Sequence, residues 1–197
     1  TLADMLRGEK RYEESVDFYS SAVKRIGELK KRHWSLLYAR GISFERSKKW
    51  QRAEEDFLQA LKLSPDQPYV LNYLGYSWVD QGINLKRARK MIERAVKLRP
   101  NDGYIVDSLG WVLYRIGDFK GAALQLERAV VLRPADPTIN DHLGDAYWKV
   151  GRLQEARYQW RRALTLKPEP ETIPAIQNKL RRGLAAGDKD EKKDGDS

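Results

Sequence analysis

Four glycines recur along this chain at intervals of 34 or 35 residues, and four prolines recur at the same intervals. The glycines are Gly41, Gly75, Gly110 and Gly144, and the prolines are Pro65, Pro100, Pro134 and Pro168. Between each glycine and its proline lie two alanines, the pairs being Ala53 and Ala60, Ala88 and Ala95, Ala122 and Ala129, and Ala156 and Ala163. A fixed period of this length is typical of stacked helical repeats. Such arrays usually present a surface to a partner rather than carry out a reaction.

Each repeat predicts two helices joined by a short turn. In residues 34–67, apolar and small side chains recur every three or four positions, which places them on one stripe of each helix. Gly41 lies inside the first helix, where it costs about 1 kcal/mol relative to alanine, so we expect the second helix to approach closely there. Pro65 ends the second helix, because proline lacks an N–H group and restricts the residue before it.

The period divides the chain into four full units with further segments at both ends. Residues 1–33 fit a partial, atypical repeat that starts inside its first helix, as in a fragment of a larger array; we expect its second helix to run on through residues 24–32. Residues 171–186 predict a capping helix, with Lys179, Arg181 and Arg182 on its polar outer face. Residues 187–197 have no apolar side chain and predict disorder. The full units are residues 34–67, 68–102, 103–136 and 137–170.

The 34-residue period, the small-residue and aromatic markers and the helix-stopping proline together resemble the tetratricopeptide repeat (TPR) family. The resemblance implies an all-α, right-handed solenoid of about four and a half helix–turn–helix repeats with a C-terminal capping helix. The chain departs from the family pattern at Arg40, where a leucine is usual, and at one inserted residue within residues 82–84. Ankyrin repeats have nearly the same period, but the sequence lacks their Thr-Pro-Leu-His signature.

The composition argues against enzymatic chemistry. The chain has no cysteine, which excludes disulfides and thiolate nucleophiles, and two histidines without cysteine argue against a zinc site. Asp107, Ser108 and His142 have the residue types of a catalytic triad, but Ser108 and His142 occupy equivalent positions one repeat apart. Helix axes pack about 8–10 Å apart, beyond the reach that a nucleophile and its base require. We therefore expect no catalytic site, no metal and no cofactor.

The net charge of +9 is concentrated on one side of the predicted array. The first helices of the four full units sum to a charge of −1, and the second helices sum to +12. In TPR proteins the first helices line a concave groove and the second helices form the outer face. The resemblance therefore implies a neutral to acidic groove and a basic back. The most basic stretch covers residues 86–99, and its outer-face residues are Lys86, Arg87, Arg89, Lys90, Arg94 and Lys97.

The TPR resemblance also implies which side chains meet a ligand, because family members generally bind through fixed positions of the first helices. At those positions this chain is rich in tyrosine and tryptophan, which dominate binding hot spots. It also has aspartates there, which can pair with lysine or arginine of a partner. The expected groove residues are Tyr38, Ile42, Tyr69, Asn72, Tyr76, Asp80, Tyr104, Asp107, Trp111, Tyr114, Asp141, Asp145 and Trp148.

These side chains predict a protein–protein interaction scaffold or adaptor. We expect its groove to hold an extended or helical segment of a partner protein with apolar anchors and some positive charge. An alternative function is binding of an anionic membrane surface or of nucleic acid through the basic outer face, although the groove aspartates oppose a phosphate backbone. A third function is purely architectural, with the groove closed against preceding repeats.

Residues 107–111 and 141–148 also resemble the C-terminal arrays of bacterial TPR proteins, some of which are envelope lipoproteins that serve as adaptors for proteases or cell-wall enzymes. This second resemblance implies a bacterial protein located in the envelope or periplasm, with the cytoplasm as the alternative. The sequence contains no run approaching the roughly 20 apolar residues that span a membrane.

Overall fold

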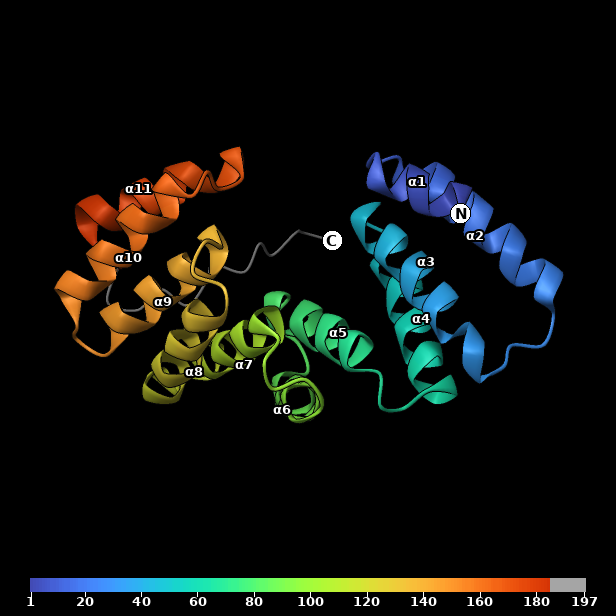
Figure 1. Ribbon diagram of the computed structural model, residues 1–197, viewed down its shortest axis with the longest axis horizontal. Coiled ribbons are helices and arrows are strands. Elements are labelled where there is room, and N and C mark those ends of the chain that lie inside the picture. Colours follow the sequence, from blue (N-terminus) through green and yellow to red (C-terminus); the bar gives the residue numbers. More distant parts are fainter. Residues whose placement is uncertain (185–197) are drawn as a thin grey trace, which may run out of the picture. The chain divides into compact units, whose positions relative to one another are not determined.

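The computed structural model describes residues 1–184, and every regular element within them is a helix (Figure 1). The chain divides into two compact units, of which unit 1 is Thr1–Arg99 and unit 2 begins at Pro100. The tail of residues 187–197, for which the sequence predicted disorder, lies outside the described residues, as do the last two residues of the expected capping segment.

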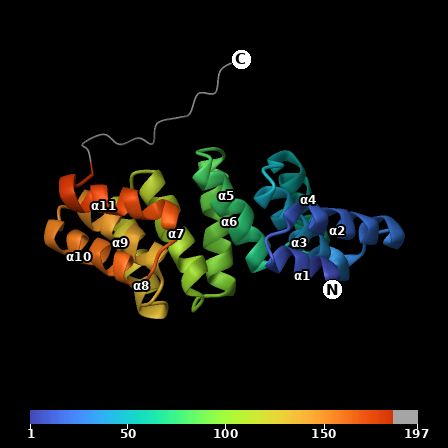
Figure 2. The same cartoon turned by 90° about the horizontal axis from the view of Figure 1, so that it is seen from above.

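Unit 1 consists of helical hairpins. α1 pairs with α2, α3 with α4 and α5 with α6, and the hairpins also pack together through α2 against α3 and through α4 against α5 (Figure 2). The elements are α1 (Leu2–Gly8), α2 (Tyr12–Ile26), a 3-10 turn η1 (Lys31–His33), α3 (Trp34–Arg46), α4 (Trp50–Leu63), α5 (Pro68–Asp80) and α6 (Leu85–Leu98).

Unit 2 repeats the same arrangement and adds a final helix. α7 pairs with α8 and α9 with α10; α8 and α7 both pack against α9, and α11 packs against α10. Asp102, Asp118 and Asp136 cap the starts of α7, α8 and α9 by accepting backbone N–H bonds. The elements are α7 (Gly103–Arg115), α8 (Phe119–Leu132), α9 (Pro137–Lys149), α10 (Leu153–Thr165), a 3-10 turn η2 (Pro170–Thr172) and α11 (Ile173–Arg182).

The periodic glycines let the two helices of each hairpin pack closely, as the sequence predicted. A Cβ atom at Gly41 would lie 2.6 Å from Cε1 of Phe57, and one at Gly110 would lie 2.5 Å from Cγ of Leu126. Both distances are shorter than any carbon–carbon contact that a folded protein tolerates. The same relation holds for Gly75 with Ile92, at 2.8 Å, and for Gly144 with Trp160, at 2.5 Å.

The first hairpin differs from the prediction at the end of its second helix. That helix was expected to run on through residues 24–32, but α2 ends at Ile26. Gly27 follows with a φ of 67°, a left-handed conformation that stops a helix, and the chain then passes through η1 into α3.

Arg40, which replaces the leucine usual in the family, is held by a buried carboxylate. Its guanidinium donates from α3 to the two carboxylate oxygens of Asp56 on α4, at 2.8 and 2.7 Å. The side chain of Asp56 is 5% exposed and that of Arg40 is 16% exposed. Burial raises the pKa of Asp56, and Arg40 opposes this rise. The arginine therefore compensates a charge that its hairpin buries.

Candidate functional site

Aromatic side chains of α7 form an ordered surface in unit 2. The rings of Trp111 and Tyr114 stack almost parallel, with centroids 5.0 Å apart. Trp111 also stacks on the imidazole of His142 from α9, with centroids 4.1 Å apart. Tyr104, at the start of α7, is 49% exposed and lies against the guanidinium of Arg133, 4.6 Å from its ring centroid. The structure thus brings three of the expected groove aromatics onto one helix, with their rings held by neighbours.

His142 joins α9 to α7 through a buried ion pair that the sequence analysis did not foresee. Its Nδ1 lies 2.9 Å from a carboxylate oxygen of Asp107, and both side chains are nearly buried. Burial disfavours the imidazolium, but nearby carboxylates, first that of Asp107, outweigh it and raise the pKa of His142. Ser108 takes no part in this pair, because its hydroxyl donates to the backbone carbonyl of Tyr104 at 3.0 Å. The three residues therefore do not form a nucleophile–base–acid relay.

Lys179 of α11 forms ion pairs with two aspartates of α9, Asp141 and Asp145. Its ammonium donates to Asp141 at 2.9 Å and to Asp145 at 2.7 Å, and Asp145 also accepts the indole N–H of Trp160 at 2.8 Å. Burial raises the pKa of Asp145 to about 6, although Lys179 favours its charged form. Lys179 was expected on the polar outer face of the capping helix, and this prediction is wrong, because the side chain is 18% exposed and points to the carboxylates.

Trp148, the last expected groove aromatic, lies against the segment that follows α11. Its indole N–H donates to the backbone carbonyl of Leu184 at 3.2 Å, and a Cβ atom at Gly183 would overlap its ring. The guanidinium of Arg157 lies 5.0 Å from the Trp148 ring, and the ring of Trp160 lies 5.5 Å away. The groove positions of the fourth repeat are therefore covered by the chain itself.

In unit 1, the expected groove residue Tyr38 belongs to an aromatic cluster of the α3–α4 and α5 helices. Its ring lies 6.1 Å from that of Phe57 and meets that of Tyr73 edge-on at 5.9 Å. Burial raises the pKa of Tyr38 to about 12. The hydroxyl of Tyr73 donates to Glu45 at 3.0 Å, which ties α5 to α3. Tyr38 thus contributes to packing between hairpins as well as to the surface.

The remaining expected groove residues of unit 1 differ in their solvent exposure. Tyr69 is 41% exposed and lies 5.7 Å from the guanidinium of Arg99, the same arrangement that Tyr104 has in unit 2. Asp80 is exposed at the end of α5. The half-buried members are Ile42, Asn72 and Tyr76.

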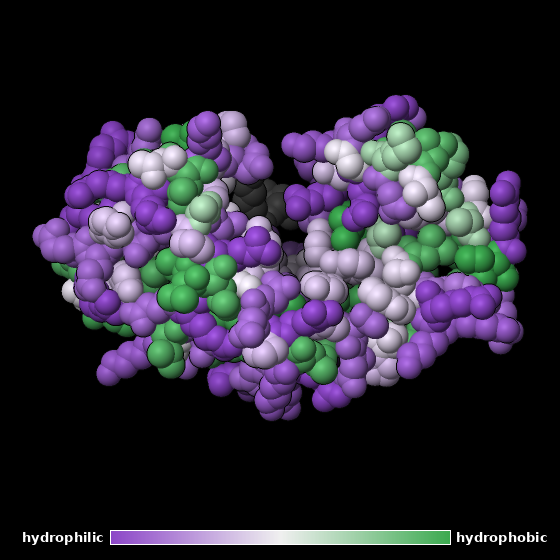
Figure 3. All heavy atoms as spheres, in the orientation of Figure 1, coloured by the Kyte–Doolittle hydropathy of each residue, from purple (hydrophilic) through white to green (hydrophobic). Residues whose placement is uncertain are grey.

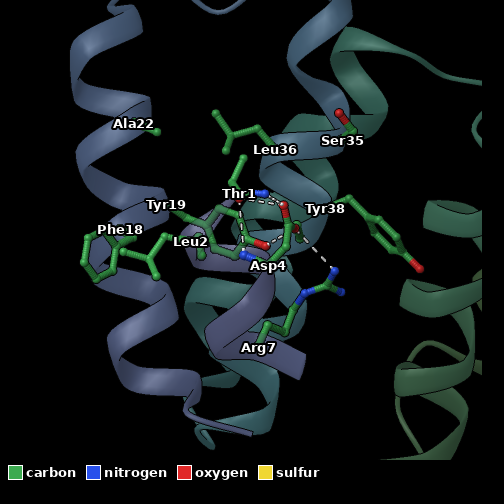
Figure 4. A pocket seen from close by; sticks show the side chains of 12 residues that line it. Thr1, Leu2, Asp4, Arg7, Phe18, Tyr19, Ala22, Ser35, Leu36 and Tyr38 are labelled. Carbon is green, nitrogen blue, oxygen red and sulfur yellow. Dashed lines mark hydrogen bonds and ion pairs between the residues drawn. The ribbon is translucent and has the colours of Figure 1, made fainter. Parts of the chain in front are cut away.

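A hollow of about 600 Å³ opens beside α1, α2 and α3 in unit 1. Figure 4 shows Ala22 of α2 and Leu36 of α3 on opposite sides of it. The polar groups at its edge bind one another, since Asp4 accepts the hydroxyl of Tyr19 at 2.6 Å. We assign it no ligand.

The six expected outer-face residues of α6 are all exposed, but they differ in their contacts. Arg94 donates to Asp66 at 2.5 Å, in the loop before α5. Arg94, Arg128 and Arg162 follow one another at intervals of 34 residues, and each contacts the loop that precedes its hairpin. Arg128 donates to the carbonyl of Pro100, and Arg162 donates to that of Pro134. This period was not among the predictions from the sequence. Figure 3 shows hydrophilic side chains over much of the face in view, with hydrophobic ones gathered in smaller patches.

The described residues contain neither a cluster of metal ligands nor a helix suited to crossing a membrane. Within residues 1–184, no group of three or more histidine, aspartate or glutamate side chains is placed to hold a metal ion. None of the helices in that range combines the length and the apolar character that crossing a membrane requires.

Comparison with family models and with curated proteins identifies the repeat. Models described as tetratricopeptide repeat match residues 34–67 and, in two overlapping segments, residues 84–138 and 108–170. A TPR repeat-containing protein of Pseudomonas aeruginosa is 34% identical over 120 residues, which is 61% of this chain and 20% of that protein. The chain thus spans about a fifth of the length of the curated relative it matches.

Solved structures with the same fold are TPR proteins of low sequence identity. A TPR protein of Thermus thermophilus aligns with a TM-score of 0.72 at 19% identity, over 91% of this chain and 95% of that one. MamA of Desulfovibrio magneticus gives a TM-score of 0.67 at 20% identity, over 84% and 94%. YrrB, described as a TPR protein with an unusual peptide-binding site, gives 0.64 at 20% identity, over 89% and 88%. These likenesses establish an α-solenoid fold.

Proposed function

Because the chain belongs to the tetratricopeptide repeat family, we propose that it is a scaffold or adaptor that holds a segment of a partner protein against its first helices. The family fold and a peptide-binding relative such as YrrB support a role in protein–protein interaction. The binding face proposed for unit 2 is the side of α7 that carries Tyr104, Trp111 and Tyr114.

The observation that carries this proposal is the ordered aromatic surface of α7. Tyr104 offers an exposed ring, and Trp111 and Tyr114 are fixed by stacking before any partner arrives. Rings that are already ordered lose little conformational entropy on binding, and tyrosine and tryptophan are enriched among hot-spot residues. Rigid aromatic anchors of this kind suit an extended or helical segment with apolar side chains.

The carboxylates of unit 2 bear on the charge of the partner. Asp107 is paired with His142, and Asp141 and Asp145 share Lys179, so binding a cation from a partner there would require breaking a contact within the chain. In unit 1, Asp80 is exposed and has no hydrogen bond or ion pair with the rest of residues 1–184. The proposed partner segment is therefore anchored on α7 mainly by apolar and aromatic side chains.

The test compares a tyrosine on the proposed face with a tyrosine on the outer face of the same unit. Tyr104 on α7 is 49% exposed and Tyr158 on α10 is 58% exposed, so Tyr104→Ala and Tyr158→Ala remove similar side chains from different faces. A partner captured from a bacterial extract by the wild-type chain is purified and titrated against each variant. We expect Tyr104→Ala to weaken binding at least about tenfold, which corresponds to about 1.4 kcal/mol. Tyr158→Ala should leave the affinity unchanged.

A second variant tests the stacked pair. Trp111→Ala combined with Tyr114→Ala should abolish capture of the same partner, and circular dichroism should show that the helices remain. Equal losses from Tyr104→Ala and Tyr158→Ala would refute a binding face on α7. Undiminished binding by the folded double variant would refute it as well.

A further inference from the structure

Three lysines form a row along the outer side of α6. Lys86, Lys90 and Lys97 are separated by four and seven residues, which places them within about 40° of one another around a helix of 3.6 residues per turn. All three are exposed. The buried side of α6 is opposite and consists of Ala88, Ile92 and Ala95, each with no exposed surface. The lysine row therefore points directly away from the hairpin.

The arginines of α6 are bound within the chain, whereas the lysines of the row are not. Arg94 donates to Asp66 at 2.5 Å, Arg89 donates to Glu93 at 2.7 Å, and the guanidinium of Arg87 lies 4.9 Å from the ring of Trp78. The structure records no hydrogen bond, ion pair or ring contact for any lysine of the row with the rest of residues 1–184. The positive charge of α6 that no carboxylate pairs is thus carried by these three ammonium groups and by Arg87, whose guanidinium lies against a ring.

The row is particular to α6 and is not a general property of the outer helices. All the equivalent positions of α8 and α10 are exposed, and only one of them is a lysine; they are Lys120, Leu124 and Val131 on α8 and Gln154, Tyr158 and Thr165 on α10. On α4 they are Gln51, Glu55 and Lys62. The other outer helices are exposed to solvent without three lysines at these positions. Exposure alone therefore does not explain the row on α6, and its charge favours an anionic partner.

We propose that the outer face of α6 is a docking surface for an anionic lipid bilayer. The row is about 16 Å long, at a rise of 1.5 Å per residue, and presents its charges to one plane. A lysine close to an anionic membrane contributes about 1 kcal/mol, or about fivefold in affinity, and needs no specific geometry. This surface is separate from the proposed binding face of α7 and does not depend on it.

The composition of α6 favours a bilayer over nucleic acid. Single-stranded nucleic acid is bound by cationic grooves with aromatic side chains for base stacking, and α6 has no aromatic residue. Readout of a duplex relies on arginine and on amide side chains, yet the arginines of α6 are engaged and it has no asparagine or glutamine. Free lysines match a diffuse layer of phosphate head groups.

The experiment measures sedimentation of the full chain with vesicles of phosphatidylcholine, with or without one third phosphatidylglycerol. We expect binding only to the anionic vesicles, and a steep loss of binding between low salt and about 0.15 M salt. The triple change Lys86→Gln, Lys90→Gln and Lys97→Gln should weaken partitioning at least tenfold at low salt. Arginine at the same three positions should restore it, because the charge is retained.

The matched control removes three charges from three different outer helices. Lys62→Gln, Lys120→Gln and Arg161→Gln lower the net charge by the same amount at exposed positions of α4, α8 and α10. We expect this control to bind vesicles within about threefold of the wild-type chain. An equal loss in both triple variants would overturn the proposal in favour of net charge. Tighter binding of the wild-type chain to an oligonucleotide or to polyglutamate than to the vesicles would overturn it in favour of those ligands.

Discussion

Replacing Gly110 with alanine tests the close packing on which the repeat depends. The added Cβ atom would lie 2.5 Å from Cγ and 2.8 Å from Cδ2 of Leu126, where ordinary contacts begin at 3.4 Å. Leu126 is fully buried, and the nearest atom is its branch carbon, so a rotation of its end groups cannot relieve the overlap. Overpacking of this kind costs about 1–3 kcal/mol. Alanine recovers about 1 kcal/mol through its higher helix propensity. The expected net effect is therefore a destabilisation of up to about 2 kcal/mol.

Gly8 provides a control with the same chemical change and the opposite expected sign. It is the last residue of α1, is exposed, and has no atom within 4 Å of the position of an added Cβ. Gly8→Ala should therefore raise the free energy of unfolding by as much as about 1 kcal/mol. Urea titration followed by circular dichroism measures both variants.

A double-mutant cycle identifies Leu126 as the cause of the strain. Leu126→Ala alone should cost about 2–5 kcal/mol, because it leaves a cavity in the core. With Gly110→Ala in the same chain, the new methyl group enters that cavity. The double variant should then be at least about 1 kcal/mol more stable than the sum of the single changes predicts. Additive effects, or a Gly110→Ala variant that is stabilised like Gly8→Ala, would show that Gly110 is not needed for close approach.

Two further predictions concern buried charges. Arg40→Leu restores the residue usual in the family but leaves Asp56 buried without a partner, so it should destabilise the protein by about 3–5 kcal/mol. Combining it with Asp56→Leu should recover most of that loss in the same urea assay. An Arg40→Leu variant with an unchanged free energy of unfolding would contradict the role of the pair. His142 has a raised pKa in the folded protein, so its contribution should be complete below the unfolded value near pH 6.5 and should be lost as pH rises through the folded pKa. The expected slope is at most about 1.4 kcal/mol per pH unit, and His142→Gln should flatten it.

The repeat and its hairpins could be predicted from the sequence, because close helix packing requires particular residue types at single positions. Glycine at position 41 and proline at position 65 report a backbone approach and a helix end, which are local requirements of each hairpin. The helix end expected at Pro65 accordingly agrees with the structure, in which α4 ends at Leu63. The exception is α2, where the prediction overlooked Gly27 as a terminator.

Partners between hairpins were not predictable in the same way. The pairs His142–Asp107 and Lys179–Asp141 join residues 35 and 38 positions apart, about one repeat. The position of a residue within its repeat predicts whether it lies on the groove side or on the outer side of the array. It does not predict which residues of neighbouring repeats contact each other. Lys179 was placed outward because charge was taken as a sign of solvent. Its spacing of three from the buried Ile176 puts it on the inward stripe of α11. Opposite charges one repeat apart on first helices are the signal that would have revealed both pairs.

The two proposed surfaces differ in whether their charged groups are paired within the chain. Carboxylates beside α7 are bound by His142 and Lys179, so binding through Tyr104 and its neighbours should depend mainly on burial of aromatic surface. The lysine row of α6 can act only through charge, which salt screens. Raising the salt concentration should therefore release the chain from anionic vesicles while a partner stays bound to α7. If salt released both ligands equally, the two surfaces would not be chemically distinct.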